Sequence, residues 1–168
     1  GLHLLRALQD LVELVGRHAA FEPLELEEPA AAVLTLAHEV VDLLLAAVDV
    51  FVADNATLVG DVHVGARSTI WYGAVLRGDV HHIRVGSETS IQDNTVAHVT
   101  HGRFPAVIGD RVTVGHSATI HGCTIGSHCI IGMGSTILDQ VEVGDNCIIG
   151  AGSLLTPGTK IPAGHLVV

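Results

Sequence analysis

The sequence predicts a mainly β protein in which a parallel β-helix of hexapeptide repeats follows an N-terminal α-helical hairpin. From residue 51 onward an aliphatic residue leads almost every block of six, in about eighteen consecutive blocks such as VADNAT, LVGDVH and VGARST. Before residue 51 the apolar spacing is helical, and Leu, Ala and Glu dominate. We therefore divide the chain into a helical segment, residues 1–50, and a β-helix domain, residues 51–168.

The N-terminal segment contains two predicted helices, at about residues 2–18 and 30–49, joined by an acidic loop. Acidic residues and proline are favoured at a helix start, and Glu27, Glu28 and Pro29 precede the second helix. Two roles remain open for this hairpin, namely packing on the β-helix or a further assembly interface. Apolar residues of the first helix recur at spacings of three and four: Leu4, Leu5, Leu8, Leu11, Val12 and Val15.

In the second segment each block forms one flat side, and three blocks close one triangular coil. Longer blocks interrupt the period at LRGDVHHIR (76–84) and AHVTHGRFPAV (97–107). Other all-β folds need hairpin turn signals, which this regular register does not supply. The repeat therefore favours a coiled solenoid over a sandwich or a barrel.

Charge and cysteine content exclude several classes of function. With 8 Lys+Arg and a net charge of −10, the chain has no basic stripe to follow a phosphate backbone, so we expect no nucleic-acid partner. Its 3 cysteines lack CxxC spacing, which favours a reducing compartment, and the first residues lack the pattern of a secretory signal. The apolar stretch 30–50 carries His38, Glu39, Asp42 and Asp49, whose charges a bilayer core would penalise. We expect a cytoplasmic chain without a membrane span.

Three histidines stand out when blocks are counted in threes. His98 and His121 occupy the second position of blocks that stack one coil apart on one side, where their imidazoles can share an ion. His116 lies at the third position of the preceding block, on the adjacent side. A neighbouring subunit of a closed three-fold assembly would supply it. If the second side of one chain faces the first side of the next in such an assembly, three equivalent metal sites form between the subunits of a homotrimer.

The same register places two charged residues beside this site. Arg77 falls one coil below His98, and Asp93 falls one coil below His116. We expect Arg77 of one subunit to pair with Asp93 of the next, with Gln92 adjacent to the pair.

Two simpler interpretations stay open at this stage. Arg77 can form a turn salt bridge with Asp79, and Cys123, close to His121, can compete as a soft metal ligand. Cys129 and Cys147 lie eighteen residues apart at an inward position, so we expect them to stack as small core residues.

Four motifs carry a resemblance to a known family: STIWYGAVLRGDV (68–80), SIQDNTVAHVTHG (90–102), VTVGHSATIHGCTIG (112–126) and IGMGSTILD (131–139). Through them, residues 51–168 resemble the gamma-class carbonic anhydrases. The resemblance implies a left-handed β-helix, an exception to the usual crossover hand. It also implies reversible hydration of carbon dioxide to bicarbonate.

By this resemblance, His98, His116 and His121 bind a catalytic metal. Zn²⁺ is the default, and Fe²⁺ or Co²⁺ suits the same ligands. Three neutral imidazoles leave one coordination position open, and the bound water acquires a pKa of about 7. The resulting metal-bound hydroxide can attack carbon dioxide.

The resemblance also gives roles to residues around the metal. Gln92 would orient hydroxide or substrate, while Arg77, Asp79 and Asp93 would shape the pocket and its ion pairs. The acidic loop that carries a glutamate proton shuttle in the best-known members is replaced here by HVTHGRFPAV. Histidines would relay protons instead, and three are candidates: His81, His82 and His101.

Rival functions come from two other classes. One is a catalytically weak or inactive trimer of the same family, which serves as a structural or assembly part. The other is a hexapeptide acyltransferase, in which one histidine is the general base for an acyl-CoA. Three histidines at metal-site positions argue against the acyltransferase, and a melting-temperature shift with acetyl-CoA would support it.

Overall fold

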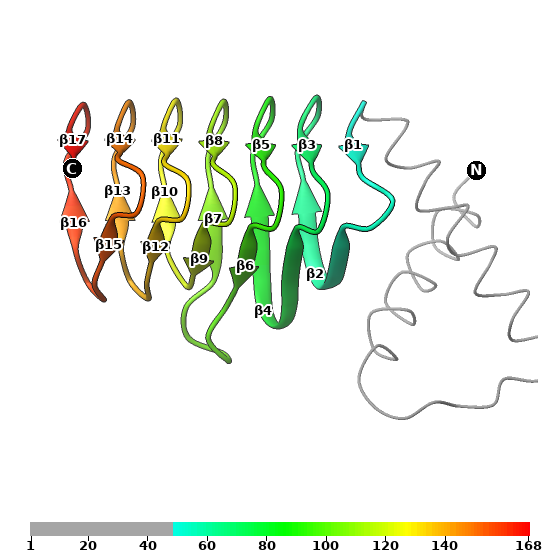
Figure 1. Ribbon diagram of the computed structural model, residues 1–168. Helices are drawn as coiled ribbons and strands as arrows, with labels where there is room; N and C mark the ends of the chain where they lie inside the picture. The colour runs from blue at the N-terminus through cyan, green and yellow to red at the C-terminus, as the bar shows by residue number, and fades with distance from the viewer. Residues whose placement is uncertain (1–48) are drawn as a thin grey trace, which may run out of the picture. The chain divides into compact units, whose positions relative to one another are not determined.

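The computed structural model describes residues 49–168, and these form a parallel coiled solenoid (Figure 1). The coils are stacked in chain order from β1 (Phe51–Val52) to β17 (Leu166–Val167). Strands pair with the strand one coil on, as where Ile130 pairs with Ile148, eighteen residues later. This spacing is the three-block turn that the repeat predicts. The helices predicted at 2–18 and 30–49 lie, but for residue 49, outside the described residues.

Three sides make up each coil. The first side is a sheet of 7 strands: β1, β3 (Thr69–Ile70), β5 (Ser90–Ile91), β8 (Thr113–Val114), β11 (Ile130–Ile131), β14 (Ile148–Ile149) and β17. The second side contains the first parts of two long strands, β2 (Thr57–Val64) and β4 (Val75–Val85). It also contains four short strands: β6 (Val96–His98), β9 (Thr119–His121), β12 (Thr136–Ile137) and β15 (Leu154–Leu155).

The third side holds the later parts of β2 and β4, followed by β7 (Ala106–Ile108), β10 (Thr124–Ile125), β13 (Glu142–Val143) and β16 (Lys160–Ile161). Because β2 and β4 continue around the corner, the second and third sides join into one hydrogen-bonded sheet. In the part of the chain that the structure describes, no helix is long and apolar enough to cross a membrane.

One side chain of each short strand points into the coil and builds the core. Successive strand residues face opposite sides of a sheet, so Ile131 is fully buried while its neighbour Ile130 is 49% exposed. The inward residues stack on their equivalents in the next coil, and Val114, Ile131 and Ile149 form one such column. The aliphatic residue that leads each block is therefore the core residue.

One corner of the coil is formed by non-glycine residues with positive φ, a conformation that costs roughly 1–2 kcal/mol per residue. Charge pairing along this corner offsets part of that cost. Arg67 and Arg111 both donate hydrogen bonds to Glu88, and these bonds hold the pKa of Glu88 down at about 2. Backbone bonds between coils, such as Glu88 N–H to the Ala66 carbonyl at 2.9 Å, hold the corner in register.

Two adjacent isoleucines allow the inward register to be tested. We expect Ile131→Ala to lower the free energy of unfolding by about 2–5 kcal/mol, because it leaves a cavity in the core. Ile130→Ala should change it by no more than about 0.5 kcal/mol, because that side chain is half exposed. Urea unfolding at one protein concentration compares the two variants, and equal losses would contradict the register.

Candidate metal centre

His98 and His121 lie side by side at the ends of β6 and β9 on the second side. The two residues are register partners, and each follows a buried core residue, Ala97 and Ile120 respectively. Alternation along the strand therefore turns both imidazoles outward. Nδ1 of His98 lies 3.1 Å from Nε2 of His121. The stacking expected from the repeat is present, and it brings one ring nitrogen from each histidine to the same point.

The other nitrogen of His98 faces a carboxylate from β4. Nε2 of His98 lies 3.2 Å from Oδ1 of Asp79, and Arg77 Nη1 donates to Oδ2 of Asp79 at 2.6 Å. Burial lowers the pKa of His98, although the Asp79 hydrogen bond opposes the shift. A neutral imidazole, the form that binds metal, is thereby favoured. The Arg77–Asp79 salt bridge left open by the sequence is present within the chain, and it also holds His98.

The other nitrogen of His121 faces a carboxylate from the coil above. Nδ1 of His121 lies 2.8 Å from Oδ1 of Asp139, the second residue after β12. Thr100 Oγ1 donates toward both oxygens of Asp139 at 3.1 Å. Sequence reasoning did not single out Asp139, although it closes the IGMGSTILD motif. Nothing in the repeat alone shows that this side chain turns back toward His121.

His116 lies after β8, at the corner between the first and second sides. Its Nδ1 is 2.8 Å from Oδ2 of Asp93, which lies one coil below as the register predicts. Within one chain His116 is not brought to the other two histidines. Residues 49–168 of a single subunit contain no group of three or more His, Cys, Asp or Glu side chains arranged to hold a metal ion.

The predicted ion pair between Arg77 and Asp93 would join two subunits. The structure contains one chain, so this ion pair stays a prediction. Within the chain Arg77 contacts Asp79, and Asp93 contacts His116. Side-chain exposure of 48% for Arg77 and 34% for Asp93 leaves both accessible to a neighbour. Gln92 follows β5 and is anchored by its backbone N–H, which donates to the Val114 carbonyl at 3.0 Å.

The cysteines face the interior. Cys123 is 2% exposed, and burial raises the pKa of its thiol to about 12, so its side chain belongs to the core and not to the outward face that carries His121. Cys129 and Cys147 stack in the core as expected, with the Cys147 N–H 3.4 Å from Cys129 Sγ.

The candidate proton-relay histidines lie around the bend of β4 and the loop that follows β6. The rings of His81 and His82 meet edge to face with centroids 4.6 Å apart, and burial lowers the pKa of His82. His101 is exposed in the loop, which is tied to β4 by a 3.2 Å bond from Gly102 N–H to the Val80 carbonyl. No measured contact joins these rings to His98 or His121.

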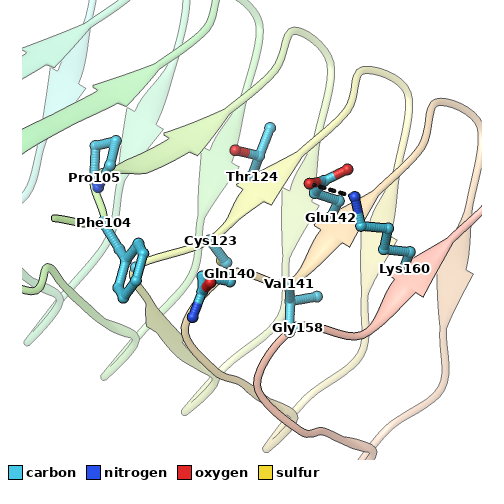
Figure 2. A pocket seen from close by; sticks show the side chains of 10 residues that line it. Phe104, Pro105, Cys123, Thr124, Gln140, Val141, Glu142, Gly158 and Lys160 are labelled. Atoms are coloured by element: carbon cyan, nitrogen blue, oxygen red, sulfur yellow. Dashed lines mark hydrogen bonds and ion pairs between the residues drawn. The ribbon is translucent and has the colours of Figure 1, made fainter.

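A groove of about 390 Å³ lies on the third side, next to the loop after β6 (Figure 2). Phe104 stands at one end of it, and the ion pair between Glu142 and Lys160 crosses the other, with Nζ and Oε1 2.9 Å apart. None of the three candidate metal ligands lines this groove.

Comparison with known proteins agrees with the repeat fold and gives the family. A model of the hexapeptide repeat, described as bacterial transferase hexapeptide (six repeats), matches residues 105–139 and 122–157. Gamma carbonic anhydrase 2 of Arabidopsis thaliana is 50% identical over 123 residues, which is 70% of this chain and 44% of that protein. Protein YrdA of Escherichia coli is 45% identical, over 70% of this chain and 67% of YrdA. This chain belongs to the gamma-class carbonic anhydrase family.

The chain matches only part of the length of each of these relatives. The chain spans less than half of the Arabidopsis gamma carbonic anhydrase 2. Among solved structures, a hexapeptide transferase family protein from Anaplasma phagocytophilum has a TM-score of 0.66 at 47% identity, covering 70% of this chain and 68% of that one. A Bacillus cereus protein described as a putative acetyltransferase has a TM-score of 0.69 at 44% identity, with the same coverage.

Thiol accessibility tests the inward placement of the cysteines. We expect the native gamma-class protein to react with an aromatic disulfide reagent at pH 8 far more slowly than the urea-unfolded chain, because all 3 thiols are buried. Absorbance of the released thiolate measures both rates. Rapid reaction of one thiol in the native protein would return Cys123 to the list of candidate ligands.

Proposed function

We propose that this protein hydrates carbon dioxide reversibly to bicarbonate, as a homotrimer with one metal site at each subunit interface. His98 and His121 of one subunit and His116 of the next hold the metal. The proposal includes the left-handed hand of the coil that the family resemblance implies. The observation that carries it is the 3.1 Å approach of His98 Nδ1 and His121 Nε2, in a chain of the gamma-class family.

The residues present fit a divalent ion. Two imidazole nitrogens converge on one point, while the opposite nitrogen of each ring faces a carboxylate: Asp79 for His98 and Asp139 for His121. This is the usual environment of metal-binding histidines, whose second nitrogen is held by a carboxylate or a carbonyl. His116 has the same kind of partner in Asp93. Zn²⁺ is the default ion for three imidazoles, and Fe²⁺ or Co²⁺ suits the same donors.

When bound, the ion lowers the pKa of a coordinated water to about 7 and so supplies hydroxide near neutral pH. The chain's own residues prepare the site for this chemistry. Burial keeps His98 neutral, and Asp79 holds that ring while it is itself held by Arg77. Gln92, next to Asp93, orients the substrate through its side-chain amide.

The placement of His116 is what suggests a trimer. Within residues 49–168 of one chain, His116 lies at the neighbouring corner beside Asp93 and away from the other two histidines, so we propose that the third ligand comes from another subunit. Arg77 and Asp93 carry opposite charges and are both partly exposed, which suits the proposed ion pair across the interface.

One rival function has an observation in its favour, because two of the similar solved structures are described as a transferase or an acetyltransferase. In an acyltransferase a single histidine would act as general base, and the convergence of two ring nitrogens would have no purpose. Acetyl-CoA would then raise the melting temperature, whereas our proposal expects no shift.

The first test of the proposed function is stopped-flow hydration of carbon dioxide by the metal-loaded protein. We expect a rate well above background, and a loss of at least about 100-fold in His116→Ala, because removal of a ligand destroys the site. His63→Ala, which removes an exposed histidine elsewhere on the coil, should keep the full rate. Both variants must first be shown to remain trimers by sedimentation. A metal-loaded wild-type trimer without activity would favour the structural role instead.

Metal removal provides an independent test. A chelator should abolish the activity and lower the melting temperature of the wild-type protein, because a ligand bound only by the folded form stabilises it, by about 2.7 kcal/mol at 100 times Kd. Added Zn²⁺ should restore both. In His116→Ala the chelator should leave the melting temperature almost unchanged. An equal response in both proteins would exclude His116 as a ligand.

A further inference from the structure

We propose that Asp139 is a positioning residue for the metal centre: its carboxylate holds the Nδ1–H of His121 and so aims Nε2 at the metal. The inference rests on the proposed function for its purpose. The hydrogen bond between Asp139 and His121 does not depend on the proposed function, because both residues belong to the same chain.

The contact is direct and requires a proton at Nδ1 of His121. Oδ1 of Asp139 is 2.8 Å from Nδ1 of His121, and a carboxylate can only accept there. A neutral imidazole carries one proton, so a proton at Nδ1 leaves the lone pair at Nε2. Nε2 is the atom that faces His98. In the opposite tautomer the N–H would point at the metal position and block it.

The carboxylate is itself held by a second segment of the chain. Thr100 Oγ1 lies 3.1 Å from each oxygen of Asp139, which fixes the plane of the carboxylate. Thr100 is anchored through its backbone, because its N–H donates to the Phe104 carbonyl at 3.0 Å. Asp139 keeps this orientation although 30% of its side chain is exposed to solvent.

A third segment leaves room for the contact. Gly122, directly after His121, has φ +52°, and a Cβ on it would lie 2.1 Å from Oδ1 of Asp139. A side chain at this position would force the Asp139 carboxylate or the backbone of Gly122 to shift, and it would also meet Cβ of Phe104 at 3.0 Å. Thr100, Gly122 and Asp139 thus come from three parts of the sequence and meet at one hydrogen bond.

Metal affinity of the assembled protein tests the role directly. Competition with a chromophoric chelator for Zn²⁺ should give a Kd for Asp139→Ala that is about 10–100-fold weaker than wild type. Asp139→Asn keeps an acceptor oxygen and should recover part of the loss. Glu142→Gln removes the same charge from an exposed ion pair outside the site and should bind as wild type.

Glycine variants test the same contact without altering Asp139. Gly122→Ala should weaken Zn²⁺ binding to a similar extent, because its Cβ displaces the carboxylate. Gly152→Ala is the matched control, since it has the same backbone strain at φ +71° with no atom within 4 Å of the added Cβ. Weakening by both glycine variants alike would assign the effect to strain and overturn the inference.

The ring tautomer of His121 separates this inference from the proposed function. In metal-free protein, long-range ¹⁵N–¹H correlation should show the Nδ1–H form in wild type and in Asp139→Asn, and a loss of that preference in Asp139→Ala. An unchanged tautomer and unchanged Kd in Asp139→Ala would overturn the inference while the metal site stands. If the wild type binds no Zn²⁺, the proposed function fails, and the tautomer still decides whether Asp139 orients His121.

Discussion

The parallel register between successive coils is the constraint on which every other feature of this structure depends. Each strand pairs with its equivalent in the next coil, so a position in one block lies directly over the same position three blocks away. A core of stacked aliphatic residues follows, because the inward position is occupied by Val, Ile or Leu in coil after coil. A shift of one residue would turn that column to solvent, which makes the register strongly specified.

The outward face follows the same register. His98 and His121 are partners in it, and their ring nitrogens meet because neighbouring strands are less than 5 Å apart. The two longer blocks depart from the period, and each brings a side chain into contact with a residue of another coil. The first continues β4 past Asp79, which reaches His98, and the second supplies Thr100, which reaches Asp139.

Each candidate ligand therefore has a carboxylate of its own, and the three carboxylates come from different elements. These contacts need no additional element, because the carboxylate partners lie on the same coils as the histidines or on neighbouring ones. The limitation of a single solenoid is geometric. Its sides diverge around a corner, so His116 cannot join the other two rings within one chain, and the proposed site is completed by a second subunit.

The amino-acid sequence by itself determined the solenoid, the block boundaries and the stacking of His98 on His121. It also determined that Asp93 lies one coil below His116. All of these follow from counting in sixes, because backbone hydrogen bonding between coils converts sequence spacing directly into distance. The tertiary structure alone decided that Asp139 turns back to His121, that Thr100 holds it, and that Cys123 faces the core. These depend on side-chain direction at a corner or in an irregular loop, where packing and local φ replace the period that made the rest readable.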